Sequence, residues 1–118
     1  MHELALTEDI LAVALDAAQR AGARAIRQLH LTLSSASHIE AETVHLHFTL
    51  ISRGTPAEGA ELVFTVRNVE QVCGNCGRTF VVNSDLSCPT CGAPALPAPH
   101  DEEMRLDGIE VDVPAEPA

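Results

Sequence analysis

The chain has 118 residues, of which 46% are hydrophobic and 20% are charged, a balance typical of one folded domain or two very small ones. Only 3% are aromatic, so the core must consist mostly of aliphatic side chains. In a chain of this length, an additional cross-link such as a bound metal would help to stabilise such a core. Seven basic residues, all Arg, stand against 17 acidic ones and give a net charge of −10. Because so acidic a surface repels phosphate backbones, we expect no nucleic-acid partner and favour metal ions and proteins.

No segment approaches the stretch of about 18 apolar residues that indicates a membrane span, and the N-terminal sequence Met1–Leu4 lacks the basic region of a signal peptide. We therefore expect a cytoplasmic protein with no membrane partner. In that reducing compartment, four cysteines in two close pairs are typical of metal ligands rather than of disulfides.

The first predicted element is an amphipathic helix over residues 4–21, where apolar side chains recur at intervals of three, four and seven. Gly22 follows it and suits the left-handed conformation in which many helices end. The pattern then changes to alternation, with Leu29, Leu31 and Leu33 on one side. This alternation predicts a strand with one buried face.

Two periodicities overlap in the next segment. The residues that alternate as in a strand are Val44, Leu46, Phe48 and Leu50. The residues that follow helical spacing are Ala41, Val44, Phe48 and Ile51. Ser37 followed by Glu40 forms a capping box, and Gly54 with Pro56 forms a stop signal, so we predict a helix here.

The remaining chain predicts two further strands around a cysteine-rich module. Residues 60–72 alternate again and predict a strand that runs directly into the first cysteine pair. A Pro-rich stretch follows the second pair, and the apolar run from Met104 to Val111 predicts an edge strand that returns to the first sheet. We therefore expect an α+β fold with a small three-stranded sheet, two helices and an added zinc-ribbon-like module.

The four cysteines predict a zinc site. The segments Cys73–Gly77 and Cys88–Gly92 are two Cys-x-x-Cys-Gly turns, with eleven residues between the two pairs. Such a spacing lets one tight turn direct two thiolates at one ion, and four thiolates in tetrahedral array suit Zn(II). The shell would be full, so we expect a structural role rather than catalysis, and a thioredoxin-like redox centre needs only one such pair. The predicted ligands are Cys73, Cys76, Cys88 and Cys91.

The N-terminus offers a second set of metal donors. The α-amine of Met1 and the amide and imidazole nitrogens of His2 can close adjacent chelate rings around Ni(II) or Cu(II). We expect Met1 to be retained because a bulky second residue hinders its removal, and Glu3 adds a carboxylate. Taken alone, this sequence is a weak signal. The histidines that we expect to be solvated are His30, His38, His45, His47 and His100.

The combined order of these features resembles the HypA/HybF family of hydrogenase nickel-incorporation proteins. The matching segments are Met1–Leu4, Thr55–Leu62, both cysteine turns, Glu103–Leu106 and Ile109–Val111. The resemblance implies a nickel metallochaperone rather than an enzyme, with a zinc domain inserted between strands of an α/β nickel-binding domain. The implied boundaries are 1–70 and 100–113 for the nickel-binding domain, 71–99 for the zinc domain and 114–118 for a disordered tail.

The resemblance also implies ligands and partners. Ni(II) would be the cargo, held by Met1, His2 and Glu3, and Zn(II) would be held by the four cysteines. The implied partners are the GTPase HypB and the large subunit of [NiFe] hydrogenase, and the chain would be a monomer or homodimer. Where the family usually has Gly after its first strand, this chain has Ser34, which puts the local turn in question.

Two other classes of function are weighed against this one. A zinc-ribbon adaptor without nickel function would be indifferent to His2→Ala or to one extra residue before Met1. An enzyme finds little support, because the sequence offers no Ser/His/Asp arrangement, phosphate-binding loop or acid–base pair.

Overall fold

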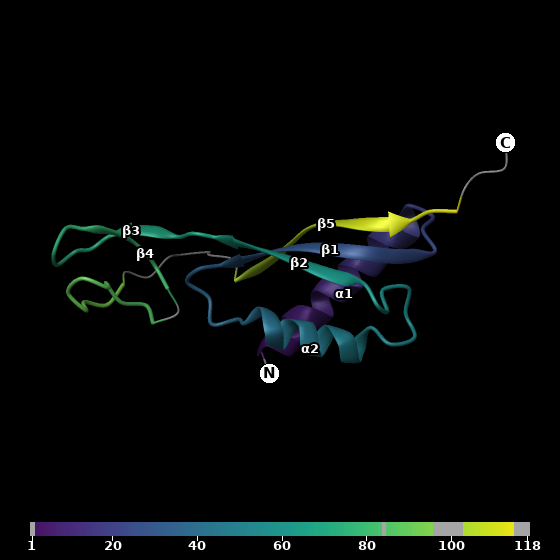
Figure 1. Cartoon of the computed structure of the whole chain (residues 1–118), viewed down its shortest axis with the longest axis horizontal. Helices are drawn as coiled ribbons and strands as arrows, with labels where there is room; N and C mark the ends of the chain where they lie inside the picture. Colours follow the sequence, from purple (N-terminus) through teal and green to yellow (C-terminus); the bar gives the residue numbers. More distant parts are fainter. Residues whose placement is uncertain (1, 84, 96–102, 115–118) are drawn as a thin grey trace.

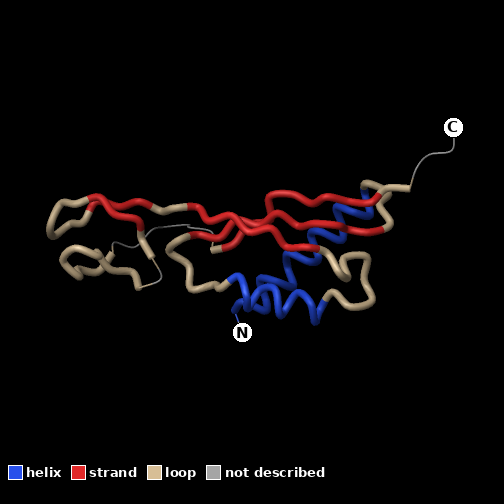
Figure 2. Tube along the Cα trace, in the orientation of Figure 1, coloured by secondary structure: helices blue, strands red, loops and turns tan. Residues whose placement is uncertain are grey.

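A computed structural model describes residues 2–83, 85–95 and 103–114 of the chain. The elements are α1 (His2–Arg20), β1 (Ala25–Ser34), α2 (Ala41–Ile51), β2 (Glu61–Arg67), β3 (Glu70–Val72), β4 (Thr79–Val81) and β5 (Met104–Asp112). Both helices pack on one face of a three-stranded sheet, and the module with β3 and β4 lies at one end of that sheet (Figure 1, Figure 2). The predicted α+β fold with two helices and a small sheet is confirmed.

The three-stranded sheet has the order β2-β1-β5. β1 runs parallel to β2, and the crossover between them contains α2, as a parallel pair requires. β5 pairs antiparallel with β1, so the chain returns to the first sheet along its edge as predicted. The register places Leu29 of β1 between Leu62 of β2 and Ile109 of β5, beneath the helices.

The end of α1 follows the sequence signal closely. Gly22 has a φ of +69°, its amide donates to the Gln19 carbonyl over 3.1 Å, and the Ala23 amide donates to the Ala18 carbonyl over 3.0 Å. These two bonds form a Schellman motif, which satisfies carbonyls left free at the end of the helix. The helix then turns directly into β1, whose second residue, Ile26, is buried against it.

The segment with two periodicities is a helix, as predicted. In α2, Val44 and Phe48 are 1% and 3% exposed, whereas Leu46 and Leu50 are 58% and 51% exposed. The predicted capping box is wrong: Glu40 is the N-cap residue and makes no side-chain cap bond. The hydroxyl of Ser37 instead accepts the Ile39 amide over 2.9 Å, because Ser37 lies in the turn before the helix and is too far from its first amides.

The single strand expected over residues 60–72 is also corrected, because the chain leaves the first sheet after Arg67 and joins a second sheet at Glu70. Between them, the Val69 amide donates to the Ser35 hydroxyl over 2.9 Å, and the Val69 carbonyl accepts the Val82 amide over 2.7 Å. The Val69 amide bonds to the β1–α2 turn, and the Val69 carbonyl bonds to the cysteine module. Because neither group is then available to β1, the hydrogen-bond ladder between β1 and β2 ends before this residue.

Ser34 suits its turn without a glycine conformation. Its hydroxyl accepts the Ala36 amide over 3.2 Å, and Leu86 is the one non-glycine residue of the described chain with positive φ. Ala36 packs against a small separate core, made of Cys73, Phe80, Val82 and Cys88. The β1–α2 turn therefore connects the sheet to the cysteine module. Of the tail expected to be disordered, residues 115–118 lie outside the described residues.

Candidate metal centres

The four cysteines come together at the end of the molecule formed by β3 and β4. All four Sγ atoms lie within 4.8 Å of one another. Sγ of Cys73 lies 3.6 Å from that of Cys91, and Sγ of Cys76 lies 3.7 Å from that of Cys88. Zn–S bonds of about 2.3 Å in a tetrahedron require sulfur separations of about 3.8 Å. The sulfur spacing therefore fits a single zinc ion.

The two cysteine turns have the same backbone design. The Cys73 amide donates to the Arg78 carbonyl, and the Gly77 amide donates to the Cys73 carbonyl, over 2.8 and 2.9 Å. In the second turn, the amides of Cys88 and Gly92 donate to the carbonyls of Ala93 and Cys88, both over 2.8 Å. Gly77 and Gly92 both have a φ of +76°, a backbone conformation that residues with a side chain rarely adopt. The turn therefore requires a Gly after each cysteine pair.

Backbone amides favour the thiolate form of Cys73, Cys88 and Cys91. The amides of Cys76 and Asn75 point at Sγ of Cys73 over 3.5 and 3.4 Å and lower the pKa of that thiol. The Cys91 amide lowers the pKa of Cys88, and the Ala93 amide lowers the pKa of Cys91.

Cys76 behaves differently from the other three cysteines. The Arg78 amide lowers its pKa, but burial and the three neighbouring sulfurs outweigh that effect and raise the pKa to about 11. A fourth thiolate beside three others needs a cation to neutralise it, which a divalent metal supplies. The arrangement is therefore chemically suited to hold a metal and, with all four positions filled by sulfur, leaves none for a substrate.

The predicted nickel donors lie at the start of α1. The helix begins at His2, and the carbonyl of Glu3 in its first turn accepts the Thr7 hydroxyl over 2.7 Å. The amides of a helix's first turn have no acceptor within the helix, so the His2 and Glu3 amides have no intrahelical hydrogen bond. Met1 and the side chain of His2 lie outside what the structure describes, and their role as ligands stays a prediction.

None of the histidines that the structure describes belongs to the cluster of cysteine sulfurs. Nε2 of His30 lies 3.3 Å from a carboxylate oxygen of Glu110, and His38 and His45 are exposed, in line with the expectation of solvated side chains. His47 departs from that expectation: it is half-buried, and its Nδ1 is buried without a hydrogen-bond partner among the described residues. His100 lies outside those residues.

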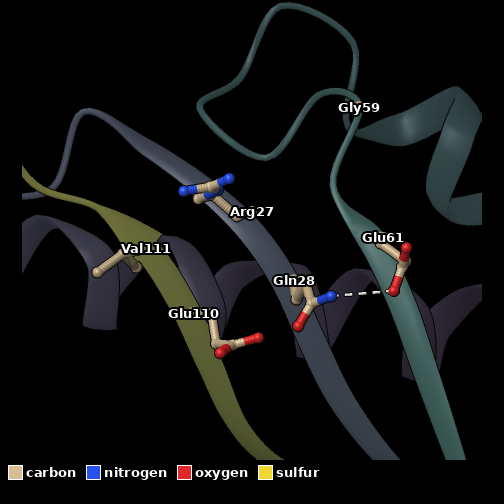
Figure 3. Close-up of a pocket in the computed structure, with 6 residues that line it drawn as sticks. All are labelled: Arg27, Gln28, Gly59, Glu61, Glu110 and Val111. Atoms are coloured by element: carbon tan, nitrogen blue, oxygen red, sulfur yellow. Dashed lines mark hydrogen bonds between the residues drawn. The ribbon is translucent and has the colours of Figure 1, made fainter.

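A polar cavity that the sequence analysis did not identify lies on the sheet face opposite the helices. Its volume is about 530 Å³, and Arg27, Gln28, Glu61 and Glu110 line it from all three strands (Figure 3). Nε2 of Gln28 donates to the Glu61 carboxylate over 3.0 Å. Arg27 is the bulged residue where β1 shifts its register against β5. The available sequence signal was the pair of successive polar residues, Arg27 and Gln28, which interrupts the alternation before Leu29.

Comparison with known proteins places this arrangement among nickel proteins. A family profile described as "Hydrogenase/urease nickel incorporation, metallochaperone, hypA" matches residues 1–111. Proteins named hydrogenase maturation factor HypA from Syntrophus aciditrophicus and Caldanaerobacter subterraneus are 36% and 30% identical to the chain, and each alignment covers 95% of the chain and 100% of the relative. The names of these relatives describe maturation factors rather than enzymes.

Solved structures share the fold. The solution structure of the Ni metallochaperone HypA from Helicobacter pylori aligns with a TM-score of 0.64 at 18% identity, covering 95% of this chain and 98% of that one. A second solution structure of a HypA protein gives the same TM-score at 22% identity. Within the described part of the chain, neither helix is long and apolar enough to cross a membrane.

Proposed function

The chain belongs to the HypA family of nickel-incorporation metallochaperones, and from this premise we propose that it delivers Ni(II) to [NiFe] hydrogenase during maturation. The observation that carries the proposal is the extent of the family match, which runs over residues 1–111 and so includes His2 and all four cysteines. A carrier must select its ion and also release it. Donors at a chain end suit release better than a closed cage does.

The proposed nickel ligands are the Met1 amine and the amide and imidazole of His2, with Glu3 beside them. Nitrogen donors in adjacent chelate rings favour Ni(II) over harder cations such as Mg(II). The helix leaves the His2 amide without an intrahelical acceptor, so metal binding there breaks no backbone hydrogen bond of α1. The Glu3 carboxylate adds negative charge close to the cation.

The proposed ligands of Zn(II) are Cys73, Cys76, Cys88 and Cys91. Their sulfur spacing supports this assignment, because it matches the edges of a tetrahedral zinc–thiolate site. When bound, zinc would stabilise a module whose core, among the described residues, consists of Cys73, Phe80, Val82 and Cys88. Soft sulfur for zinc and nitrogen for nickel would keep the two metals at separate sites.

We assign residues 1–70 and 100–113 to a nickel-binding domain and residues 71–99 to an inserted zinc domain. The break after Arg67, where the chain changes sheets, supports a boundary close to the proposed one. The proposed partners are the GTPase HypB and the hydrogenase large subunit. The proposed location is the cytoplasm, where free thiols stay reduced and available to a metal.

Nickel calorimetry on untagged, zinc-loaded protein tests the ligand set. We expect wild type to bind about one nickel ion, and His2→Ala and a variant with one extra residue before Met1 to lose that binding. His38→Ala removes an exposed imidazole from the β1–α2 connection and serves as the matched control, which should bind as wild type does. Equal binding by all four proteins would place nickel elsewhere and favour the zinc-ribbon adaptor.

A further inference from the structure

The outer face of α2 is apolar, although it points away from the sheet. The inner face of the helix buries Val44 and Phe48 in the cores that it shares with the sheet. On the outer face, at the lower margin of the molecule in Figure 1, the side chains of Leu46 and Leu50 lie one helical turn apart and are more than half exposed. A surface helix normally carries polar side chains there, as α1 does at Asp16. The outer face of α2 therefore has the composition of a contact surface.

Formal charges lie only at the two ends of this face. Glu42 is in the first turn of α2, Arg53 follows its last turn, and the ten residues between them carry no formal charge when His is neutral. Positions 42, 46, 49 and 53 are spaced by four, three and four residues, which places them on one line along the helix. We call Glu42, Leu46, Thr49, Leu50 and Arg53 the outer stripe of α2, and all five are exposed.

Both charged ends of the outer stripe can pair with a partner. Glu42 and Arg53 form no ion pair within the described residues. Glu58 lines the same cavity as Arg53, but its carboxylate accepts the Gly54 amide over 3.1 Å. The backbone of Ser52, the C-cap residue, is still in the right-handed helical region, so Arg53 continues the stripe beyond the helix. The stripe thus has an acidic start, an apolar middle and a basic end.

Such a stripe is complementary to a second copy of itself. When two copies of α2 cross antiparallel about a two-fold axis, position 42 of each copy faces position 53 of the other, and Leu46 faces the partner's Leu50. Each Glu42 then meets the partner's Arg53, and the four leucines form one apolar contact. A parallel arrangement would instead place like charges together. The sequence of the stripe therefore specifies both the partner and the orientation.

We propose that the outer stripe of α2 is a self-association surface, through which two copies of the chain form an antiparallel, two-fold symmetric dimer. Each Leu46 packs against the partner's Leu50, and each Glu42 pairs with the partner's Arg53. The contact is closed by its symmetry, so it joins two copies and does not extend into a filament. It involves none of the proposed metal ligands and does not depend on nickel delivery.

The dimer is expected to be weak. A contact between one pair of short helices is at the low end of the size range of specific interfaces. Each copy also carries a net charge of −10, so the two copies repel each other outside the stripe. We expect a dissociation constant on the order of 10–100 µM. Unfolding measured at about 1 µM then reports on the monomer, and the dimer forms in concentrated solution.

The test measures the monomer–dimer equilibrium of the full, zinc-loaded chain by sedimentation velocity, from about 10 µM to about 1 mM. Glu42→Arg and Arg53→Glu each place like charges opposite one another, so we expect each to weaken association about tenfold or more. The double variant with both substitutions exchanges the two charges and should return the dissociation constant to within about threefold of wild type. Restored association in the double variant cannot come from damage to the helix, because it carries both changes.

A pair of alanine variants tests the apolar part of the contact. Leu46→Ala should weaken association about fivefold or more. Val13→Ala is the matched control, because it shortens an equally exposed side chain on the outer face of α1, and it should change association less than about twofold.

The outcomes separate this proposal from the proposed function. Wild type that stays monomeric at about 1 mM would overturn the self-association surface. A dimer that resists Leu46→Ala and both single charge variants, or that the double variant fails to restore, would place the contact elsewhere and overturn it too. Neither result bears on nickel delivery, because the number of nickel ions bound per chain should be the same in all these proteins.

Discussion

Asp107 shows how a single side chain can stabilise the irregular part of an edge strand. It is the bulged residue of β5, where the register against β1 shifts between His30 and Leu31. Its carboxylate accepts a hydrogen bond from the Thr32 hydroxyl and another from Nε of Arg105 over 2.7 Å. The Thr32 bond, followed by that of Arg105, lowers the pKa of Asp107.

A lowered pKa in the folded state means that Asp107 stabilises the fold at neutral pH and that this stabilisation is lost as the pH falls through the folded-state pKa. We expect Asp107→Asn to reduce the free energy of unfolding by about 1 kcal/mol at pH 7, discounted for solvent exposure, and the difference from wild type to disappear in strong acid. Urea unfolding followed by far-ultraviolet circular dichroism at several pH values measures this. Asp85→Asn, on the cysteine module, is the control, and a loss in Asp107→Asn that is independent of pH would contradict the account.

Residue-level chemistry of the cysteine cluster was predictable, because ligand spacing within a turn is a local property. Two residues between the cysteines and a following glycine define each turn without reference to the rest of the fold. The bulges at Arg27 and Asp107 were not predicted, since each depends on how β1 and β5 align. Neither was the polar cavity of Figure 3, which requires all three strands of the sheet to be placed in space.

At the scale of elements, α2 resolves the choice that sequence periodicity left between helix and strand. A strand would place Val44, Leu46, Phe48 and Leu50 on one face, whereas the helix buries the first and third and exposes the other two. The Gly54 and Pro56 stop signals pointed to the helix. The break between β2 and β3 had no such signal, because it depends on the hydroxyl of Ser35, which is distant in sequence.

A pair of alanine substitutions in α2 tests this orientation. Phe48→Ala should lower the free energy of unfolding by about 3–5 kcal/mol, because it opens a cavity in the core shared by both helices and the sheet. Leu46→Ala should lower it by less than about 0.5 kcal/mol, because that side chain is mostly exposed. Denaturant unfolding measures both values, and comparable losses would contradict the helical packing.

At the scale of the whole molecule, the chain folds into two regions, each with its own hydrophobic core, and local contacts connect the two. One region holds α1, α2 and the three-stranded sheet, and the other holds the cysteines with Phe80 and Val82. Ala36 and the bond between Val69 and Ser35 connect them. The return of β5 to β1 was predictable from its apolar pattern. The contact between the β1–α2 turn and the cysteine module was not predictable, because nothing in the sequence of the turn indicates which segment it packs against.

This organisation predicts that the two regions respond differently to metal removal. Chelation of zinc should unfold the cysteine module, because the small core described there cannot offset the loss of chain entropy, while the helices stay folded. Hydrogen exchange should then show loss of protection for residues 73–92, with the helical circular dichroism signal retained. Cys88→Ser should give the same result without chelator. Collapse of the helical signal on zinc removal would show instead that the module holds the whole molecule together.

A direct transfer experiment measures whether this chain hands nickel to a hydrogenase, as we propose. Nickel-loaded chain is mixed with nickel-free hydrogenase large subunit, HypB and GTP, in the presence of a chelator that captures any nickel released into solution. We expect wild type to place nickel in the large subunit despite the chelator and His2→Ala to fail to do so. If nickel from wild type goes to the chelator and none reaches the large subunit, the claim of nickel delivery is wrong.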